Sequence, residues 1–244
     1  MTIDPRLAVI QKRLTPIKRT IVFSSAKGGV GKSICAVASA LALAQLGFRT
    51  GILDLDFQGA SAHVLLGQTL SFPEEASGIK PFQVNERLDF MSFAAFSREH
   101  PVPLRGSDVT QAIIELLAIT IWKELDFLIV DMPPGIGDEI LDLLRFMDRA
   151  EFIVIATPSR VVLRVVGRLL EMLESLEVPV IGVIENMAAE AAGSTTKALA
   201  KRYQTALLGS IPYIDTIDRF IGSPDALLNS VLGLKVKQII SSII

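Results

Sequence analysis

A glycine-rich loop between an apolar strand and a long helix constrains the fold of this chain more than any other feature. The loop is the run Ala26-Lys-Gly-Gly-Val-Gly-Lys-Ser33. Apolar residues over Thr20–Ser25 predict the strand before it, and the run Gly31–Leu46 predicts the helix after it, ending at Gly47. A strand that runs through such a loop into a helix is typical of the first unit of a parallel sheet.

The remainder of the chain repeats this alternation of short apolar runs with longer helical ones. The short runs are apolar throughout, which indicates strands buried on both faces of a sheet that carries helices on both sides. We therefore predict an α/β fold with a doubly wound, mostly parallel sheet. We expect a single domain over 1–244, with 1–17 as an N-terminal extension and a less regular stretch at 58–86. Further strands are predicted at Thr50–Asp54, Leu88–Phe93, Phe127–Asp131, Phe152–Ala156, Val178–Ile184 and Ala206–Ser210, and further helices at Val109–Trp122, Glu139–Met147, Val161–Leu176 and about Asp225–Ile243.

The composition excludes several classes of protein. Half of the 244 residues are hydrophobic, enough for a sizeable core, and the net charge of −2 offers no basic excess for a nucleic-acid partner. No apolar run approaches the ~20 residues that span a bilayer, and no secretory signal precedes Lys18. We therefore expect a cytoplasmic protein that is not attached to a membrane. The single cysteine, Cys35, can form no internal disulfide and is expected to pack as a small apolar side chain.

The chemistry of the loop indicates a phosphate-binding site. Its glycines let backbone N–H groups turn inward around phosphate oxygens, and the helix that starts there adds the positive end of its dipole. Lys32 is predicted to reach the β- and γ-phosphates of ATP, and the Ser33 hydroxyl to bind Mg²⁺. The alternative, a glycine-rich turn without a ligand, leaves the full pattern and both flanking elements unexplained. The predicted nucleotide-binding residues of the loop are Gly28, Gly29, Val30, Gly31, Lys32, Ser33 and Ile34.

Three aspartates stand at the ends of predicted strands. Asp131 ends an apolar strand, where a carboxylate binds Mg²⁺ through water in sites of this class, and Asp54 and Asp56 follow the second strand. An isolated aspartate at a strand end is often only a cap for the next turn. Three of them at neighbouring strand ends beside one phosphate loop favour a common role. The predicted metal ligands are therefore Ser33, Asp54 and Asp131.

Five further segments carry a family resemblance that extends over about residues 18–244. They are Asp54-Leu-Asp56-Phe-Gln-Gly-Ala-Ser61, Pro103-Leu-Arg105-Gly106, Val130-Asp131-Met-Pro-Pro-Gly135-Ile-Gly-Asp138, Gly182-Val-Ile-Glu-Asn186-Met187 and Gly209-Ser-Ile-Pro212-Tyr213. With the additional lysine at its start, Lys27, the loop resembles the deviant Walker A motif of the MinD/ParA/Mrp group of P-loop ATPases. Within that group the chain is similar to the Mrp-type ATPases, which act as iron–sulfur cluster carriers. The segment that begins at Val130 is the most specific, because MinD and ParA relatives usually differ there.

The resemblance implies roles for residues around the phosphates. Lys27 is expected to reach the nucleotide of a second subunit, which implies a homodimer, and to neutralise charge on the transferred phosphoryl group. Asp56 is expected to position the attacking water, with Asp54 beside Mg²⁺. The predicted catalytic residues are therefore Lys27, Lys32 and Asp56.

The resemblance also implies which residues contact the nucleotide base. Asn186 and Pro212 match positions that contact adenine, and the chain has no Asn-Lys-x-Asp sequence to recognise guanine. For Asn186 the alternative is a turn residue at a strand end. Arg105 matches a switch or dimer-face position, and its alternative is an exposed arginine without a role.

The chain departs from its family at the place where an iron–sulfur cluster is held. Cluster-bridging members carry Cys-x-x-Cys shortly after the Glu-Asn-Met segment, whereas this chain has Ala188-Ala-Glu-Ala-Ala-Gly193. A cluster typically needs about four thiolates, and two copies of Cys35 supply only two. We therefore expect no protein-held iron–sulfur cluster.

One leading hypothesis and two alternatives follow. The leading hypothesis is a Mg-dependent ATPase of the Mrp type whose dimer closure assists iron–sulfur or metallocentre assembly, with the metal held by a client or scaffold protein. The first alternative is a MinD/ParA-like positioning or partitioning ATPase, and the second is a nucleotide-dependent scaffold with little turnover. The C-terminal run Leu234–Ile244 carries only Lys235 and Lys237, so we expect it to pack in the core rather than bind a membrane.

Overall fold

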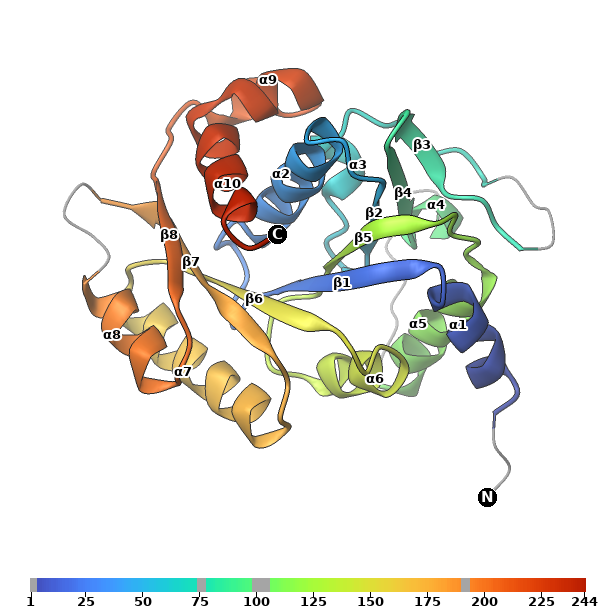
Figure 1. The fold of residues 1–244 in the computed structure, drawn as a ribbon, viewed down its shortest axis with the longest axis horizontal. Coiled ribbons are helices and arrows are strands. Elements are labelled where there is room, and N and C mark those ends of the chain that lie inside the picture. The colour runs from blue at the N-terminus through green and yellow to red at the C-terminus, as the bar shows by residue number, and fades with distance from the viewer. Residues whose placement is uncertain (1–3, 74–77, 98–105, 190–193) are drawn as a thin grey trace.

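The computed structural model describes residues 4–73, 78–97, 106–189 and 194–244. These residues form an eight-stranded sheet in the order β3-β4-β2-β5-β1-β6-β7-β8, parallel throughout except where β3 pairs antiparallel with β4 (Figure 1). The doubly wound, mostly parallel sheet expected from the sequence is confirmed. The strands are β1 (Ile17–Ser24), β2 (Thr50–Asp54), β3 (Phe82–Asn85), β4 (Leu88–Ser92), β5 (Leu125–Asp131), β6 (Glu151–Ala156), β7 (Val180–Ala188) and β8 (Leu207–Pro212).

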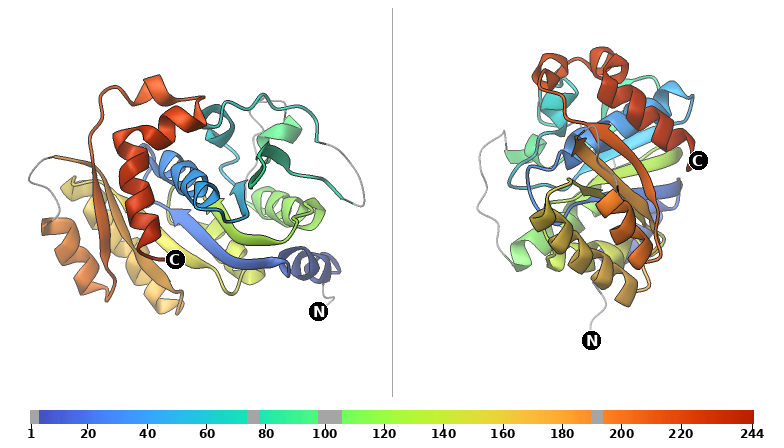
Figure 2. Two further views of the ribbon diagram at one scale, coloured as in Figure 1. Left: turned by 45° about the horizontal axis from the view of Figure 1, so that its top comes forward. Right: turned by 90° about the vertical axis from the view of Figure 1, so that its left-hand side faces the viewer.

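Helices cover both faces of the sheet, as Figures 1 and 2 show. Helices α2, α9 and α10 lie on one face, and α1, α5, α6, α7 and α8 lie on the other (Figure 1). The helices are α1 (Arg6–Leu14), α2 (Lys32–Gln45), α3 (Ala62–Leu65), α4 (Ala94–Ser97), α5 (Ser107–Ile119), α6 (Asp138–Phe146), α7 (Arg160–Ser175), α8 (Ser194–Arg202), α9 (Pro224–Asn229) and α10 (Val231–Ser241), and a 3₁₀ turn, η1, spans Ile217–Phe220.

The centre of the sheet determines where a ligand can bind. Strand β1 lies between β5 and β6, and its residues Ile21, Val22 and Phe23 are fully buried. The chain leaves β1 through α2 on one face and leaves the neighbouring β5 through α6 on the other face. Ligands of open α/β sheets bind beyond the carboxyl ends of the strands at such a point. The loop that follows β1 lies there.

Helix α2 packs between the sheet and α10, which explains its unusual sequence. Residues 35–44 of this helix are all buried, including Cys35 and Ser39. A helix that is apolar on all sides is stable only where every side is covered. The expectation that Cys35 packs as a small apolar residue is confirmed by its complete burial.

Several short elements were not predicted from the sequence. Helix α1 lies within the expected N-terminal extension and packs against α5 with Ile10 fully buried. The stretch expected to be irregular contains α3 and the short edge strand β3, whose residues alternate between half-buried and exposed. Helix α8 is largely polar, and only Thr196 and Ala200 are buried. Short or polar elements have little hydrophobic periodicity, so their sequence signal is weak.

The final helix, expected as one unit from about Asp225 to Ile243, is two helices. Ser230 has φ −70° and ψ 165°, which ends α9 and begins α10. Its hydroxyl accepts the N–H of Gly233 at 3.1 Å and donates to the carbonyl of Leu227 at 2.6 Å. A Cβ at Gly233 would lie 2.3 Å from that same carbonyl oxygen, so a glycine is required for the two helices to meet at this angle. The expectation of a single helix is therefore wrong, because a serine cap has no apolar periodicity to reveal it.

Candidate functional site

The loop after β1 has a backbone that only glycines can adopt comfortably. Gly29 and Gly31 have φ values of +78° and +82°. A Cβ at Gly31 would lie 2.2 Å from Nδ2 of Asn186, and one at Gly28 would lie 3.8 Å from Pro134. The left-handed glycines let the chain curl so that consecutive N–H groups face one point, which is the geometry of an anion-binding loop.

Lys32 and Asp131 form a buried ion pair at the base of this loop. The Lys32 ammonium donates to Oδ1 of Asp131, and the two side chains are 6% and 0% exposed. The same ammonium lies 3.2 Å from the Ser33 hydroxyl. The second carboxylate oxygen of Asp131, Oδ2, is buried and accepts no hydrogen bond from the described residues. A buried oxygen without a donor is costly, and a metal ion or its bound water can satisfy it.

Asp54 places a second buried carboxylate beside the first. It is paired in register with Asp131 across β2 and β5. Its oxygens accept the N–H of Asp56 at 3.0 Å and the N–H of Ala62 at 3.4 Å. Burial, reinforced by the negative charge of Asp131, raises the pKa of Asp54 to about 8. Burial also raises the pKa of Asp131, although its attraction to Lys32 opposes the rise.

A cavity of about 340 Å³ opens above the loop. This volume is at the lower end of the range for small-molecule sites, about 300–1,000 Å³. Asp56 faces it and accepts the N–H of Gly59 at 2.8 Å. The lining residues are Ser25, Gly28, Gly29, Val30, Gly31, Lys32, Ser33, Ile34, Asp56, Gly59, Ser61, Leu65, Pro134 and Ile221.

Some of these lining residues were missed from the sequence. Three of them, Gly59, Ser61 and Pro134, lie in the segments that carry the family resemblance. Their closeness in sequence to Asp56 and Asp131 is a signal from which they could have been predicted. Ile221 lies far along the chain, in the loop before α9, and reaches the cavity because Gly222 donates its N–H to the carbonyl of Leu65 at 3.3 Å. No local pattern in the sequence points to it.

The remaining predicted residues lie around the cavity rather than in its wall. Asn186 is buried, and its side-chain N–H donates to the carbonyl of Val30 at 2.9 Å. It therefore contacts the loop without lining the cavity. Pro212 ends β8 and is exposed, and it does not line the cavity. Lys27, at the start of the loop, is exposed. Arg105 lies outside the described residues.

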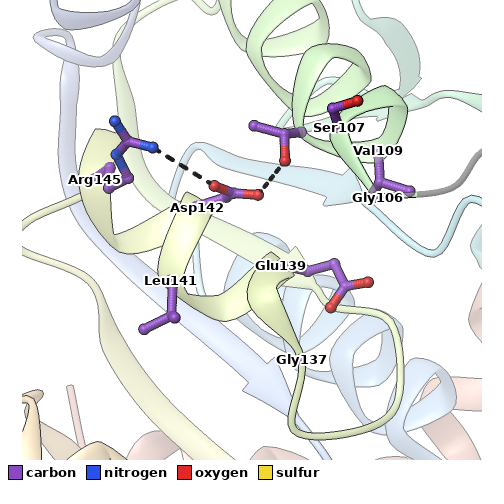
Figure 3. Close-up of a pocket in the computed structure, with 9 residues that line it drawn as sticks. Gly106, Ser107, Val109, Gly137, Glu139, Leu141, Asp142 and Arg145 are labelled. Atoms are coloured by element: carbon purple, nitrogen blue, oxygen red, sulfur yellow. Dashed lines mark hydrogen bonds and ion pairs between the residues drawn. The ribbon is translucent and has the colours of Figure 1, made fainter.

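A second and larger hollow, of about 720 Å³, lies between α5 and α6 (Figure 3). In its wall the Thr110 hydroxyl donates to Asp142, and Arg145 lies 3.9 Å from the same carboxylate. Gly137 lines this hollow, and Pro134 of the same loop lines the cavity above β1. The loop from β5 to α6 therefore borders both spaces, but the phosphate-binding geometry is found only at the smaller one among the described residues.

The described residues offer no cluster of three or more histidine, cysteine or acidic side chains suited to a metal ion of their own. Burial raises the pKa of the Cys35 thiol to about 12, which favours the uncharged thiol at neutral pH. Within the described parts of the chain, every helix is too short or too polar to cross a membrane.

Comparison with known proteins agrees with this geometry. A ParA family model described as NUBPL iron-transfer P-loop NTPase matches residues 16–243. The iron–sulfur cluster carrier protein of Pyrococcus furiosus is 37% identical over 197 residues, which cover 76% of this chain and 67% of the relative. The iron–sulfur cluster carrier protein of Escherichia coli K12 is 34% identical over 215 residues, which cover 83% of this chain and 58% of the relative. The alignment therefore leaves a third or more of each relative unmatched.

A solved structure extends the similarity to the whole fold. The nucleotide-binding protein of Archaeoglobus fulgidus, in complex with ADP, is similar with a TM-score of 0.76 and 26% identity. The match covers 92% of this chain and 93% of that one. With the family model spanning nearly all of the sequence, the chain belongs to the ParA-type family of NUBPL iron-transfer P-loop NTPases.

Proposed function

We propose that this protein is a Mg-dependent ATPase of the Mrp type that assists iron–sulfur cluster or metallocentre assembly. One observation carries the nucleotide part of the proposal. The left-handed glycines of the loop lie beside the buried side chains of Lys32, Asp131 and Asp54 and the half-buried Ser33. A structural turn needs no buried charges beneath it, whereas a triphosphate and its metal ion need this combination of cation and hard oxygen ligands.

The residues present fit Mg²⁺. The Ser33 hydroxyl and the carboxylates of Asp54 and Asp131 would hold it, and the unpartnered Oδ2 of Asp131 is an acceptor that such an ion would satisfy. Bound Mg²⁺ supplies charge neutralisation on the phosphate oxygens. Lys32 would bind the β- and γ-phosphates, and Asp56, at the mouth of the cavity, would orient the attacking water.

The role in iron–sulfur assembly rests on the relatives. Curated proteins 34–37% identical to this chain are named iron–sulfur cluster carriers, which favours cluster assembly over positioning or partitioning. The single buried Cys35 does not supply the thiolates of a cluster. We therefore propose that a client or scaffold protein holds the cluster and that this chain acts on that complex. Anaerobic reconstitution with iron and sulfide, followed by desalting, should leave no stoichiometric iron on the isolated chain, and close to four irons per dimer would contradict this.

The face around Lys27 supports a nucleotide-dependent homodimer. Exposed apolar side chains stand at or just beyond the carboxyl ends of four strands: Ile136 after β5, Val161 after β6, Met187 in β7 and Tyr213 after β8. Lys27 is exposed after β1, between them in the order of the sheet. Apolar groups gathered at one edge of a sheet are typical of an interaction surface. A symmetric dimer through this face would cover them and bring each Lys27 to the phosphates of the other subunit.

Nucleotide titration and turnover test the proposal. The wild-type protein should bind a fluorescent ATP analogue saturably and hydrolyse ATP only with Mg²⁺. Lys27→Ala should bind ATP about as well, hydrolyse it poorly, and dimerise less than wild type in light scattering with a slowly hydrolysed analogue. Absence of saturable binding would refute the nucleotide site, and equal turnover by a monomeric wild type and Lys27→Ala would remove the role of Lys27.

A further inference from the structure

A buried glutamate near the end of β7 has no role in the site described so far. Glu185 is 1% exposed. The Thr196 hydroxyl, in the first turn of α8, donates to its Oε1, and the Ser210 hydroxyl, in β8, donates to its Oε2 at 3.1 Å. Among the described residues no cation lies within ion-pair distance of it. The carboxylate is therefore held by two hydroxyl groups from two different elements.

The residues that follow Glu185 form a β-bulge. Glu185 pairs with Ser210 and Ala188 pairs with Pro212, so Asn186 and Met187 together oppose one residue of β8. Met187 has a φ of +56°, a left-handed conformation that is strained for a side chain of its size. A bulge re-aims the side chains of its strand.

One side chain at the start of this bulge contacts the phosphate loop. The Asn186 amide points inward to the Val30 carbonyl at 2.9 Å, while Met187 points outward and is 36% exposed. In a regular strand the side chains of residues 185 and 187 would share one face of the sheet, and Asn186 would occupy the register position opposite Ile211. Asn186 directly follows the Glu185–Ser210 pair and points to the opposite face of the sheet, so its contact with the loop depends on where Glu185 fixes the strand.

We propose that Glu185 is a positioning residue for the nucleotide site. Its two hydroxyl partners fix the end of β7 against β8 and α8, and this holds Asn186, the next residue, on the phosphate loop. The inference rests on the proposed binding of nucleotide and adds to it a residue that contacts neither nucleotide nor loop. It also ties the first turn of α8 to the loop, so a displacement of α8 changes nucleotide affinity.

The chemistry of Glu185 supports a positioning role over simple packing. A buried carboxylate is costly unless hydrogen bonds satisfy it, and an apolar side chain would fill the same space without that penalty. Two directional hydrogen bonds specify the relative position of three elements, which an apolar contact does not.

Thr196→Val tests the anchor, because it removes the hydroxyl and nearly keeps the shape. A hydrogen bond to a charged group has a free energy large enough that the dissociation constant for a fluorescent ATP analogue should rise about five- to tenfold. Thr196→Ser keeps the hydroxyl and should restore the wild-type value. Thr195→Val, at an exposed neighbouring position of α8, is the matched control and should have no effect. All measurements are made well below the melting temperature of each variant.

A double-mutant cycle with Asn186 distinguishes positioning from a general loss of stability. Asn186→Ala alone should weaken binding, and adding Thr196→Val should weaken it no further, because both changes remove the same contact. Additive effects, or a lower melting temperature with unchanged affinity, would overturn the inference. If Thr196→Val does not fold, Ser210→Ala, which removes the other hydroxyl partner of Glu185 at a half-buried position, replaces it in the same double-mutant cycle with Asn186→Ala. Failure of the wild type to bind nucleotide would instead refute the proposed function, so the two failures are distinguishable.

Discussion

Replacement of Lys32 by methionine probes the buried ion pair and the nucleotide site at once. Methionine has a similar length and no charge, so Lys32→Met leaves the Asp131 carboxylate buried without its cation. Breaking a buried pair by removing one partner costs about 3–5 kcal/mol of unfolding free energy. In a chain of this size, each kcal/mol lowers the melting temperature by about 2–4 °C, so a fall of about 6–20 °C is expected.

The pH dependence of this loss has a defined sign. Burial already raises the pKa of Asp131, and removal of Lys32 raises it further. Asp131 in the variant therefore takes up a proton as the pH falls, which neutralises the unpaired charge. The deficit in melting temperature relative to wild type should be larger at pH 8.5 than at pH 6.

Two further variants test whether the unpaired charge of Asp131 causes the loss of stability. Lys32→Met combined with Asp131→Asn leaves no unpaired charge, so it should be more stable than Lys32→Met alone. Lys27→Met removes an exposed lysine from the same loop and should change the unfolding free energy by less than about 0.5 kcal/mol. Thermal unfolding is followed by circular dichroism with EDTA and without nucleotide.

The same variants measure how much Lys32 contributes to nucleotide binding. A lost hydrogen bond between a charged donor and phosphate weakens binding by about 10- to 150-fold, from about 1.5–3 kcal/mol. Titration with a fluorescent ATP analogue measures it, with Lys27→Met as the control that binds normally. A melting temperature for Lys32→Met within about 2 °C of Lys27→Met, together with equal affinity, would refute the importance of the buried pair.

Three further predictions concern the acidic residues and the loop. Burial raises the pKa of Asp54 in the folded protein to about 8, whereas in the unfolded chain it is about 4. Between these two pH values the folded protein holds a proton that the unfolded chain has released. The free energy of unfolding therefore falls as the pH rises from about 4 to about 8. Asp54→Asn should flatten this slope and raise the melting temperature at pH 8 in EDTA while lowering Mg-dependent hydrolysis; an unchanged slope would contradict the assignment. Asp56→Ala should bind ATP nearly normally and hydrolyse it at least tenfold more slowly, because a water-orienting group acts mainly in the transition state. Turnover at the wild-type rate would mean that Asp56 is only a turn residue. Gly31→Ala forces a side chain onto a φ of +82° and a Cβ to 2.2 Å from the Asn186 amide, so nucleotide affinity should fall; equal affinity by titration would show that the loop tolerates the strain.

The fold class and most of the strands could be predicted from local sequence. Apolar runs such as Thr50–Asp54 and Glu151–Ala156 lie in the middle of the sheet, and in both cases the predicted and observed bounds agree to within one residue. The elements that were missed include α1, β3 and α8, which lie at the periphery. Their stability depends on contacts with other elements rather than on their own periodicity, so local sequence carries little information about them.

The sequence by itself determined the phosphate loop, because its glycines, lysine and serine are contiguous and their spacing is sufficient to specify the geometry. It also determined the aspartates at strand ends, since the carboxyl ends of parallel strands must meet at one edge of a sheet. Only the tertiary structure decided that Lys32 pairs with Asp131, that Ile221 closes the cavity and that Glu185 anchors the bulge behind Asn186. Each of these contacts joins residues far apart in the chain, and its free energy depends on burial and on a partner that no local pattern specifies.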